Sequence, residues 1–224
     1  MSGRGRTLLE EGWPDTPDFV EVVRIWNIDA SRILLSFVWQ GYDLLQKKDL
    51  ANIAWNQVEE ELERNITQLF ELKIRKVMTG YEPFDVQHGP YENETRQPSP
   101  AQPPQYDIAF VLNQNPRIMW PLEAKVLRTD GAVAPYINDL KNEFLTCRYA
   151  PFSTEGAILG YLLSGKPDNV FRHLEAKFPC QLFHHPAFPD REHRYSDHPR
   201  HVPTGKSYPP HFRCHHLILR MRRE

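Results

Sequence analysis

The chain is poor in cysteine and has no long apolar run. Its 224 residues include three cysteines, Cys147, Cys180 and Cys214. This small, odd set favours reduced thiols in an intracellular protein over a disulfide framework. No apolar stretch approaches the length of a membrane span, and no hydrophobic segment of signal type follows residues 1–6. We therefore expect a cytoplasmic protein without a membrane partner.

The sequence also lacks a strong charge of either sign. Its formal net charge of -2 provides no basic excess to drive non-specific binding of nucleic acid over the whole surface. Basic residues are concentrated only locally, in the stretch 211–223, where a basic groove remains an option. No P-loop is present, so an ATPase, if the function needs one, would be a separate subunit. A hydrophobic fraction of 40% fits one globular domain with appendages.

Two apolar runs with a short polar turn between them predict a β-hairpin. Residues 105–112 and 118–127 each read as a strand, and 113–117 are rich in turn-forming residues. A connection this short favours antiparallel pairing. Pro121 cannot donate a hydrogen bond to the ladder, so the second strand should be bulged there or open on one side.

The hairpin would bring two carboxylates and an ammonium group together. Side chains alternate along a strand, so Glu123 and Lys125 share one face, and Asp107 can approach them from the neighbouring strand. Hard oxygen ligands suit Mg2+ or Mn2+, which can hold a phosphate and activate water. The alternative is that Asp107 caps a strand and Glu123 pairs with Lys125 at the surface. The apolar neighbours argue against it, because unpaired charge in a central strand is costly.

Asp107 followed by Glu123-Ala124-Lys125 resembles the motif of the PD-(D/E)XK nuclease superfamily, the restriction-endonuclease-like fold. Tyr106 stands where that motif has proline. The resemblance implies a metal-dependent nuclease acting on nucleic acid, DNA more than RNA. Asp107 and Glu123 would bind Mg2+ or Mn2+ together with the Ala124 carbonyl, and Lys125 would stabilise the nucleophile and the transition state.

An amphipathic helix is expected before the hairpin, from about residue 49 to residue 77. In the superfamily, a glutamate from the first core helix often completes the metal site, and Glu59 is the position that matches, with Glu63 in reserve. The alternative is that the glutamates form a solvated helical face. The apolar stripe of this helix consists of Trp55, Val58, Leu62, Ile66 and Leu69.

The other elements complete the expected fold. A short first strand is expected at 84–86, a helix at 136–145 and a buried strand at 158–163 that pairs in parallel with the E-x-K strand. A further helix is expected at 30–46. The predicted fold class is α/β, a restriction-endonuclease-like core with a mixed central β-sheet flanked by helices and an N-terminal helical extension.

We expect three segments along the chain. Residues 1–48 form the helical extension, 49–178 the nuclease core, and 179–224 a His/Pro-rich segment that ends in a strand packed on the core. Most of the ten histidines lie in this last segment, without the compact paired spacing of a structural zinc site. Surface histidines are therefore preferred over a zinc-stabilised nucleic-acid-binding module.

The substrate and partner predictions follow from the same resemblance. Lys141, Arg148 and His198 are candidates to contact substrate phosphates, although an ordinary charged helix face is the preferred interpretation of the first two. By analogy, the chain would be the effector subunit of a prokaryotic restriction or antiphage defence system, working with an ATPase or sensor protein or as a homodimer. The alternative is a catalytically inactive nuclease-fold scaffold. The intact set of two acids and a lysine speaks against it.

Overall fold

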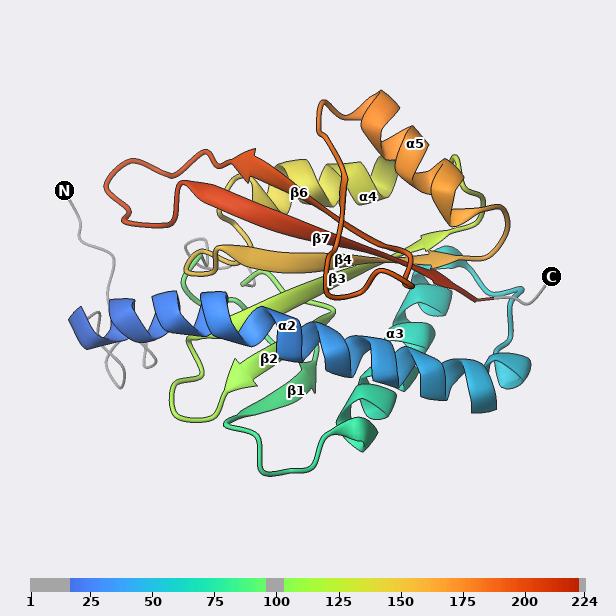
Figure 1. The fold of residues 1–224 in the computed structure, drawn as a ribbon, viewed down its shortest axis with the longest axis horizontal. Helices are drawn as coiled ribbons and strands as arrows, with labels where there is room; N and C mark the ends of the chain where they lie inside the picture. The colour runs from blue at the N-terminus through green and yellow to red at the C-terminus, as the bar shows by residue number, and fades with distance from the viewer. Residues whose placement is uncertain (1–16, 96–102, 222–224) are drawn as a thin grey trace.

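A mixed seven-stranded β-sheet forms the centre of the computed structural model, which describes residues 17–95 and 103–221 (Figure 1). The strand order is β1-β2-β3-β4-β7-β6-β5. The pairs β3-β4 and β4-β7 are parallel, and the other pairs are antiparallel. The strands are β1 (Phe84–His88), β2 (Ile108–Leu112), β3 (Met119–Leu127), β4 (Glu155–Leu162), β5 (Phe183–His184), β6 (His193–Pro199) and β7 (His211–Arg220).

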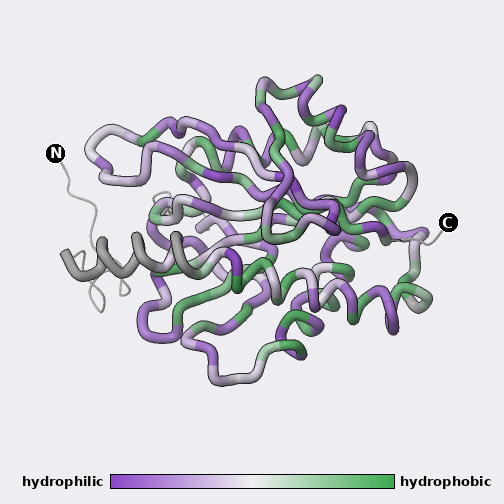
Figure 2. Tube along the Cα trace, viewed as in Figure 1, coloured by the Kyte–Doolittle hydropathy of each residue, from purple (hydrophilic) through white to green (hydrophobic). Residues whose placement is uncertain are grey.

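Helices cover both faces of this sheet, so that the apolar strands in its centre lie between two layers (Figure 2). The long α2 and α3 pack on one face, and α4 and α5 pack on the other. No helix among the described residues combines the length and apolar character that a bilayer crossing requires. The helices are α2 (Pro17–Lys48), the 3-10 turn η1 (Leu50–Asn52), α3 (Glu59–Val77), α4 (Ala134–Asp139), the π-helical η2 (Leu140–Phe144) and α5 (Pro167–Lys177).

The predicted hairpin is confirmed: β2 and β3 pair antiparallel in a continuous register. The expected parallel pairing of β3 with β4 is also confirmed, and so is the short first strand. At Pro121 the ladder is open on one side instead of bulged. Pro121 lies opposite Ala109 of β2, whereas pairing with β4 begins one residue later, at Leu122.

The helix predicted from residue 49 begins later. Residues 50–52 form a 3-10 turn, and α3 starts at Glu59, so Trp55 and Val58 precede it. Their helical spacing from Leu62 is therefore coincidental, and Val58 is exposed. The buried apolar residues of α3 recur every fourth position, which fixes the face that meets the sheet. They are Leu62, Ile66, Phe70 and Ile74.

The histidine-rich segment lies inside the sheet. It supplies β5, β6 and β7, and β7 occupies an interior position between β4 and β6. The expectation of surface histidines is wrong for four of them, because neighbouring strands hold them in the core. The Ser196 hydroxyl, for example, lies 2.6 Å from His198 Nε2 and 2.7 Å from His216 Nε2, so these polar atoms are satisfied internally. The buried histidines are His193, His198, His215 and His216.

Close packing of α2 on α3 depends on Gly41. A Cβ atom at this position would lie 2.8 Å from Ile74 Cγ1 and 3.0 Å from the Ile74 backbone nitrogen. Because helical backbone cannot move aside locally, we expect Gly41→Ala to destabilise the protein by about 2 kcal/mol. Urea denaturation would measure this, with Gly131→Ala as the reference, because a Cβ atom at Gly131 would meet its nearest neighbour, His173, at an ordinary contact distance of 3.6 Å. Equal stability of Gly41→Ala and wild type would contradict this packing.

Candidate active site

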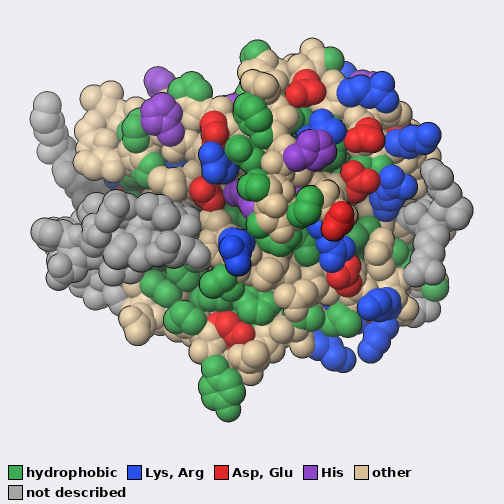
Figure 3. Space-filling model, viewed as in Figure 1, with side chains coloured by type: hydrophobic (Ala, Val, Ile, Leu, Met, Phe, Trp, Pro, Cys, Tyr) green, Lys and Arg blue, Asp and Glu red, His purple; other side chains and the backbone are tan. Residues whose placement is uncertain are grey.

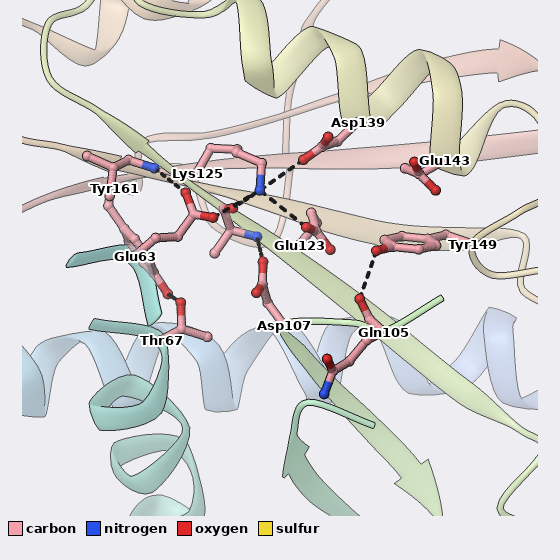
Figure 4. A network of polar contacts seen from close by, with 12 residues as sticks. Glu63, Thr67, Gln105, Asp107, Glu123, Lys125, Asp139, Glu143, Tyr149 and Tyr161 are labelled. Atoms are coloured by element: carbon pink, nitrogen blue, oxygen red, sulfur yellow. Dashed lines mark hydrogen bonds and ion pairs between the residues drawn. The ribbon is translucent and has the colours of Figure 1, made fainter. Parts of the chain in front are cut away.

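The site forms where β2 ends beside β3. Pairing of the two strands stops at Ile108 and Leu122, so β3 continues with backbone N–H groups that β2 no longer reaches. Two carboxylates accept these hydrogen bonds. The Ala124 N–H donates to Asp107 Oδ2 at 2.8 Å, and the Val126 N–H donates to Glu63 Oε2 at 2.9 Å (Figure 4). The backbone of β3 thus fixes two acids along a single strand edge, Asp107 from the position just before β2 and Glu63 from α3.

Glu123 is the most deeply buried acid of the group, with 7% of its surface exposed. Its Oε1 accepts a hydrogen bond from Lys125 Nζ at 3.3 Å, whereas its Oε2 has no hydrogen-bond partner among the described residues. Burial raises the pKa of Glu123 well above its usual range, and the adjacent Asp107 carboxylate raises it further. A buried carboxylate oxygen without a donor is costly, so this atom is suited to carry a proton towards Asp107 or to bind a cation.

Lys125 is surrounded by acids. Its Nζ lies 3.0 Å from Glu63 Oε1 and 3.0 Å from Asp139 Oδ2, in addition to the Glu123 contact, and it donates to the Ala124 carbonyl at 2.8 Å. Burial acts to lower the pKa of Lys125, but these carboxylates outweigh it and raise the pKa above its ordinary value. The ammonium therefore remains charged at neutral pH.

The charge of the cluster is unbalanced. Glu63, Asp107, Glu123 and Asp139 supply four carboxylates against the single Lys125 (Figure 4). Burial raises the pKa of both Glu63 and Asp139, as it does for Glu123. A divalent cation would relieve this repulsion, and carboxylate and carbonyl oxygens are the ligands that Mg2+ and Mn2+ prefer. The donor set therefore fits a hard divalent ion.

Of the two α3 glutamates considered for the site, the reserve candidate is the one that reaches the cluster. Glu63 reaches the cluster, whereas Glu59 pairs with Arg128 at 3.2 Å, with both side chains 46% exposed. The predicted position, Glu59, is thus one helical turn too early. Its assignment rested on a helix already formed at Trp55, but α3 begins at Glu59 itself. The face of α3 that meets the end of β3 carries Glu63.

The three proposed phosphate contacts do not join the cluster. Lys141 is exposed, and its Nζ lies 5.1 Å from the centre of the Phe178 ring. Arg148 is also exposed and pairs with Glu143 at 2.7 Å. His198 is buried against Ser196 and cannot meet a substrate without a rearrangement of the sheet. Arg148 is the best placed of the three, since its partner Glu143 lies beside the cluster (Figure 4).

Sequence reasoning missed Asp139 and Tyr149. Asp139 ends α4 and follows the buried Tyr136 by three residues, so it lies at the border of an apolar helical stripe. Glu63 has the same kind of position on α3, and this border position is the signal that could have found both. Tyr149 is buried, donates to the Gln105 carbonyl at 2.7 Å and faces the acids. Burial raises its pKa, and Glu123 raises it further.

The face of the molecule shown in Figure 3 mixes acidic and basic side chains without a broad patch of one sign. This agrees with the net charge of -2. Comparisons of this chain with protein-family models, with curated proteins and with solved structures find no match.

Proposed function

We propose that this chain is a metal-dependent nuclease with a restriction-endonuclease-like core, hydrolysing phosphodiester bonds of nucleic acid. The observation that carries the proposal is the unpartnered, buried Glu123 Oε2 beside Asp107 and Lys125. The PD-(D/E)XK resemblance also leads one to expect this set. It consists of one acid, a second acid two residues before a lysine, and a glutamate from a helix. DNA is the first substrate to test, and RNA the second.

Asp107 and Glu123 are the residues that would hold Mg2+ or Mn2+, because they lie side by side where the pairing of β2 with β3 stops, and no arginine among the described residues pairs with either. When bound, such an ion lowers the pKa of a coordinated water and offsets negative charge on the phosphate. The protein fixes its ligands before substrate arrives. Asp107 is fixed by the Ala124 N–H, and Glu123 by its place within β3.

Lys125 acts electrostatically in this proposal and does not serve as the base. Its raised pKa keeps the ammonium protonated, so Nζ can stabilise the charge that develops on the phosphoryl oxygens. Glu63 and Asp139 hold Nζ from two sides. Their raised pKa values bring these carboxylates closer to neutrality, which suits them to accept a proton from the attacking water.

A cleavage assay tests the proposal directly. Purified protein is incubated with supercoiled plasmid, linear duplex, single-stranded DNA and RNA, with Mg2+, with Mn2+ or with EDTA. We expect cleavage of at least one substrate with either metal ion and none with EDTA. Cleavage that persists in Asp107→Ala would overturn the site. Tight binding of nucleic acid without cleavage under every metal condition would instead support the inactive scaffold.

The two helix glutamates offer a matched pair of variants. We expect Glu63→Gln to reduce the cleavage rate by about 100-fold, because its amide NH2 group would face either the Lys125 ammonium or the Val126 N–H, both of which are donors. Glu59→Gln removes the same charge from the same helix but only loosens an exposed pair with Arg128. Its rate should remain within about twofold of wild type. Equal losses in the two variants would show that helix charge, not position, matters.

A further inference from the structure

Three histidines converge on the sheet face opposite the candidate active site. His193 begins β6, His215 lies in β7, and His185 follows β5, so three separate segments contribute one imidazole each. One nitrogen from each ring lies within 4.8 Å of the others. His215 faces α2 and packs near Trp120, whereas its neighbour His216 faces α4. The cluster is therefore separate from the carboxylate site.

From this convergence we propose that His185, His193 and His215 form a second metal site, for Zn2+ or a similar divalent ion that prefers nitrogen ligands. His193 Nε2 and His215 Nδ1 lie 3.2 Å apart. Two nitrogens bound to one tetrahedral zinc, each at about 2.0 Å, lie about 3.3 Å from each other. The spacing thus matches two ligands of one ion. A water molecule can complete the tetrahedron on the side of half-buried His185.

A carboxylate behind His215 supports this assignment. His215 Nε2 lies 3.3 Å from Glu155 Oε2, which places the ring proton on Nε2 and leaves Nδ1 with a free electron pair. Metal-binding histidines usually donate their outer N–H to such a carboxylate or carbonyl. Glu155 therefore orients the ring without being a ligand itself.

The segment that carries His185 is anchored. Its backbone N–H donates to the His193 carbonyl at 3.2 Å, and the two rings stack with centroids 4.6 Å apart. Further along, Arg191 makes two 2.7 Å hydrogen bonds to Asp43 of α2.

Metal binding must displace two hydrogen bonds. Trp39 Nε1 donates to His193 Nδ1 at 3.3 Å, and the Ala187 N–H donates to His185 Nδ1 at 3.2 Å. A ring that binds zinc through Nε2 carries its proton on Nδ1, so these donors compete with the ion. Both contacts are longer than the usual distance of about 2.9–3.0 Å. Removing the indole donor should therefore leave zinc binding as tight as in wild type, or tighter.

The test is zinc titration of untagged, full-length protein by calorimetry, with excess Mg2+ present to occupy the carboxylate site. We expect one zinc ion per chain at the cluster. His185→Gln and His184→Gln form a matched pair, because they are adjacent residues and His184 is exposed outside the cluster. His185→Gln should weaken zinc binding at least tenfold, and His184→Gln should leave it within about twofold of wild type.

Two further variants test whether the three histidines bind a metal ion or only hydrogen-bond to one another. Glu155→Gln should weaken zinc binding about tenfold, and Trp39→Phe should not weaken it. Circular dichroism confirms that each variant is folded. Absence of stoichiometric zinc binding by wild type, or equal binding by the two histidine variants, would overturn the proposal. Neither result depends on cleavage activity, so the second site and the proposed nuclease fail or stand separately.

Discussion

Replacing Glu123 by glutamine is expected to abolish cleavage while stabilising the metal-free protein. Activity should fall by about 1000-fold or more, because a neutral amide cannot hold the divalent ion with Asp107. Stability should rise by about 1 kcal/mol, the lower end of the cost of leaving a buried polar atom without a hydrogen-bond partner. The gain arises because wild type must take up a proton at Glu123 or bury its charge when it folds at neutral pH, whereas the glutamine needs neither. Lys125 keeps Glu63 and Asp139 as partners.

The pH dependence of this gain has a definite sign. Below about pH 4, the ordinary pKa of glutamate, Glu123 is protonated in both the folded and the unfolded chain, and the variants should be equally stable. Above it the unfolded chain ionises first, because the pKa of Glu123 is raised in the folded state. Wild type therefore loses stability relative to Glu123→Gln as the pH rises towards neutrality.

Thermal denaturation with EDTA at pH 4 and at pH 7 measures this difference. Saturating Mg2+ should reverse it at pH 7, because the ion stabilises wild type through ligands that the variant lacks. Glu60→Gln removes the charge of an exposed glutamate of α3, and it should leave activity unchanged and stability within about 0.5 kcal/mol of wild type. A destabilised Glu123→Gln protein in EDTA would show that this carboxylate has a structural partner.

Replacing Lys125 by methionine is expected to have the opposite effect on stability. The change leaves Glu63, Glu123 and Asp139 facing one another without the ammonium that now contacts all three. Removal of one partner from a buried ionic group is strongly destabilising, here by about 3 kcal/mol. Cleavage should also be lost, because no other cation contacts this set of acids among the described residues. Chemical denaturation in EDTA would measure the stability change.

Lys141→Met is the matched control for this variant. It exchanges the same side chains on the helical segment that follows β3, at an exposed position, so stability and cleavage should stay close to wild type. Added Mg2+ should return part of the stability lost in Lys125→Met, because the ion neutralises the same carboxylates. A Lys125→Met protein as stable as wild type would show that the acids are protonated in the native state without the lysine.

The hairpin and its acids could be predicted from sequence because strand alternation is a local rule. Leu122, Ala124 and Val126 lie in the core on the side of α2, so Glu123 and Lys125 must face the other way. The short turn between the two strands then brings Asp107 next to Glu123 and Lys125. These steps involve neighbours in sequence, and the structure bears them out.

The glutamate that α3 contributes to the cluster could not be predicted from local rules. Glu59 and Glu63 are one turn apart on the same face, and only the point at which α3 passes the end of β3 distinguishes them. That point depends on the start of the helix and on long-range packing. Asp139 was missed for a related reason, because its role depends on where α4 crosses the sheet.

The buried histidines show a second limit of sequence reasoning. A run such as His215-His216 reads as polar, and polar residues are usually exposed. In the sheet, these two side chains point to opposite faces and each finds a polar partner from another strand. The register between β6 and β7 creates these partners, and no local pattern in either strand reveals that register.

Asp107 and Glu63 have a structural role that Glu123 lacks, since they accept hydrogen bonds from backbone N–H groups at the edge of β3 that β2 does not reach. If related chains lost the proposed catalysis, selection for folding would still retain those two acids. Substitutions of Glu123 would be tolerated first, because its buried Oε2 accepts no hydrogen bond from the described residues. Under the proposed function, the residue at position 123 would therefore distinguish related sequences that bind the ion from those that do not.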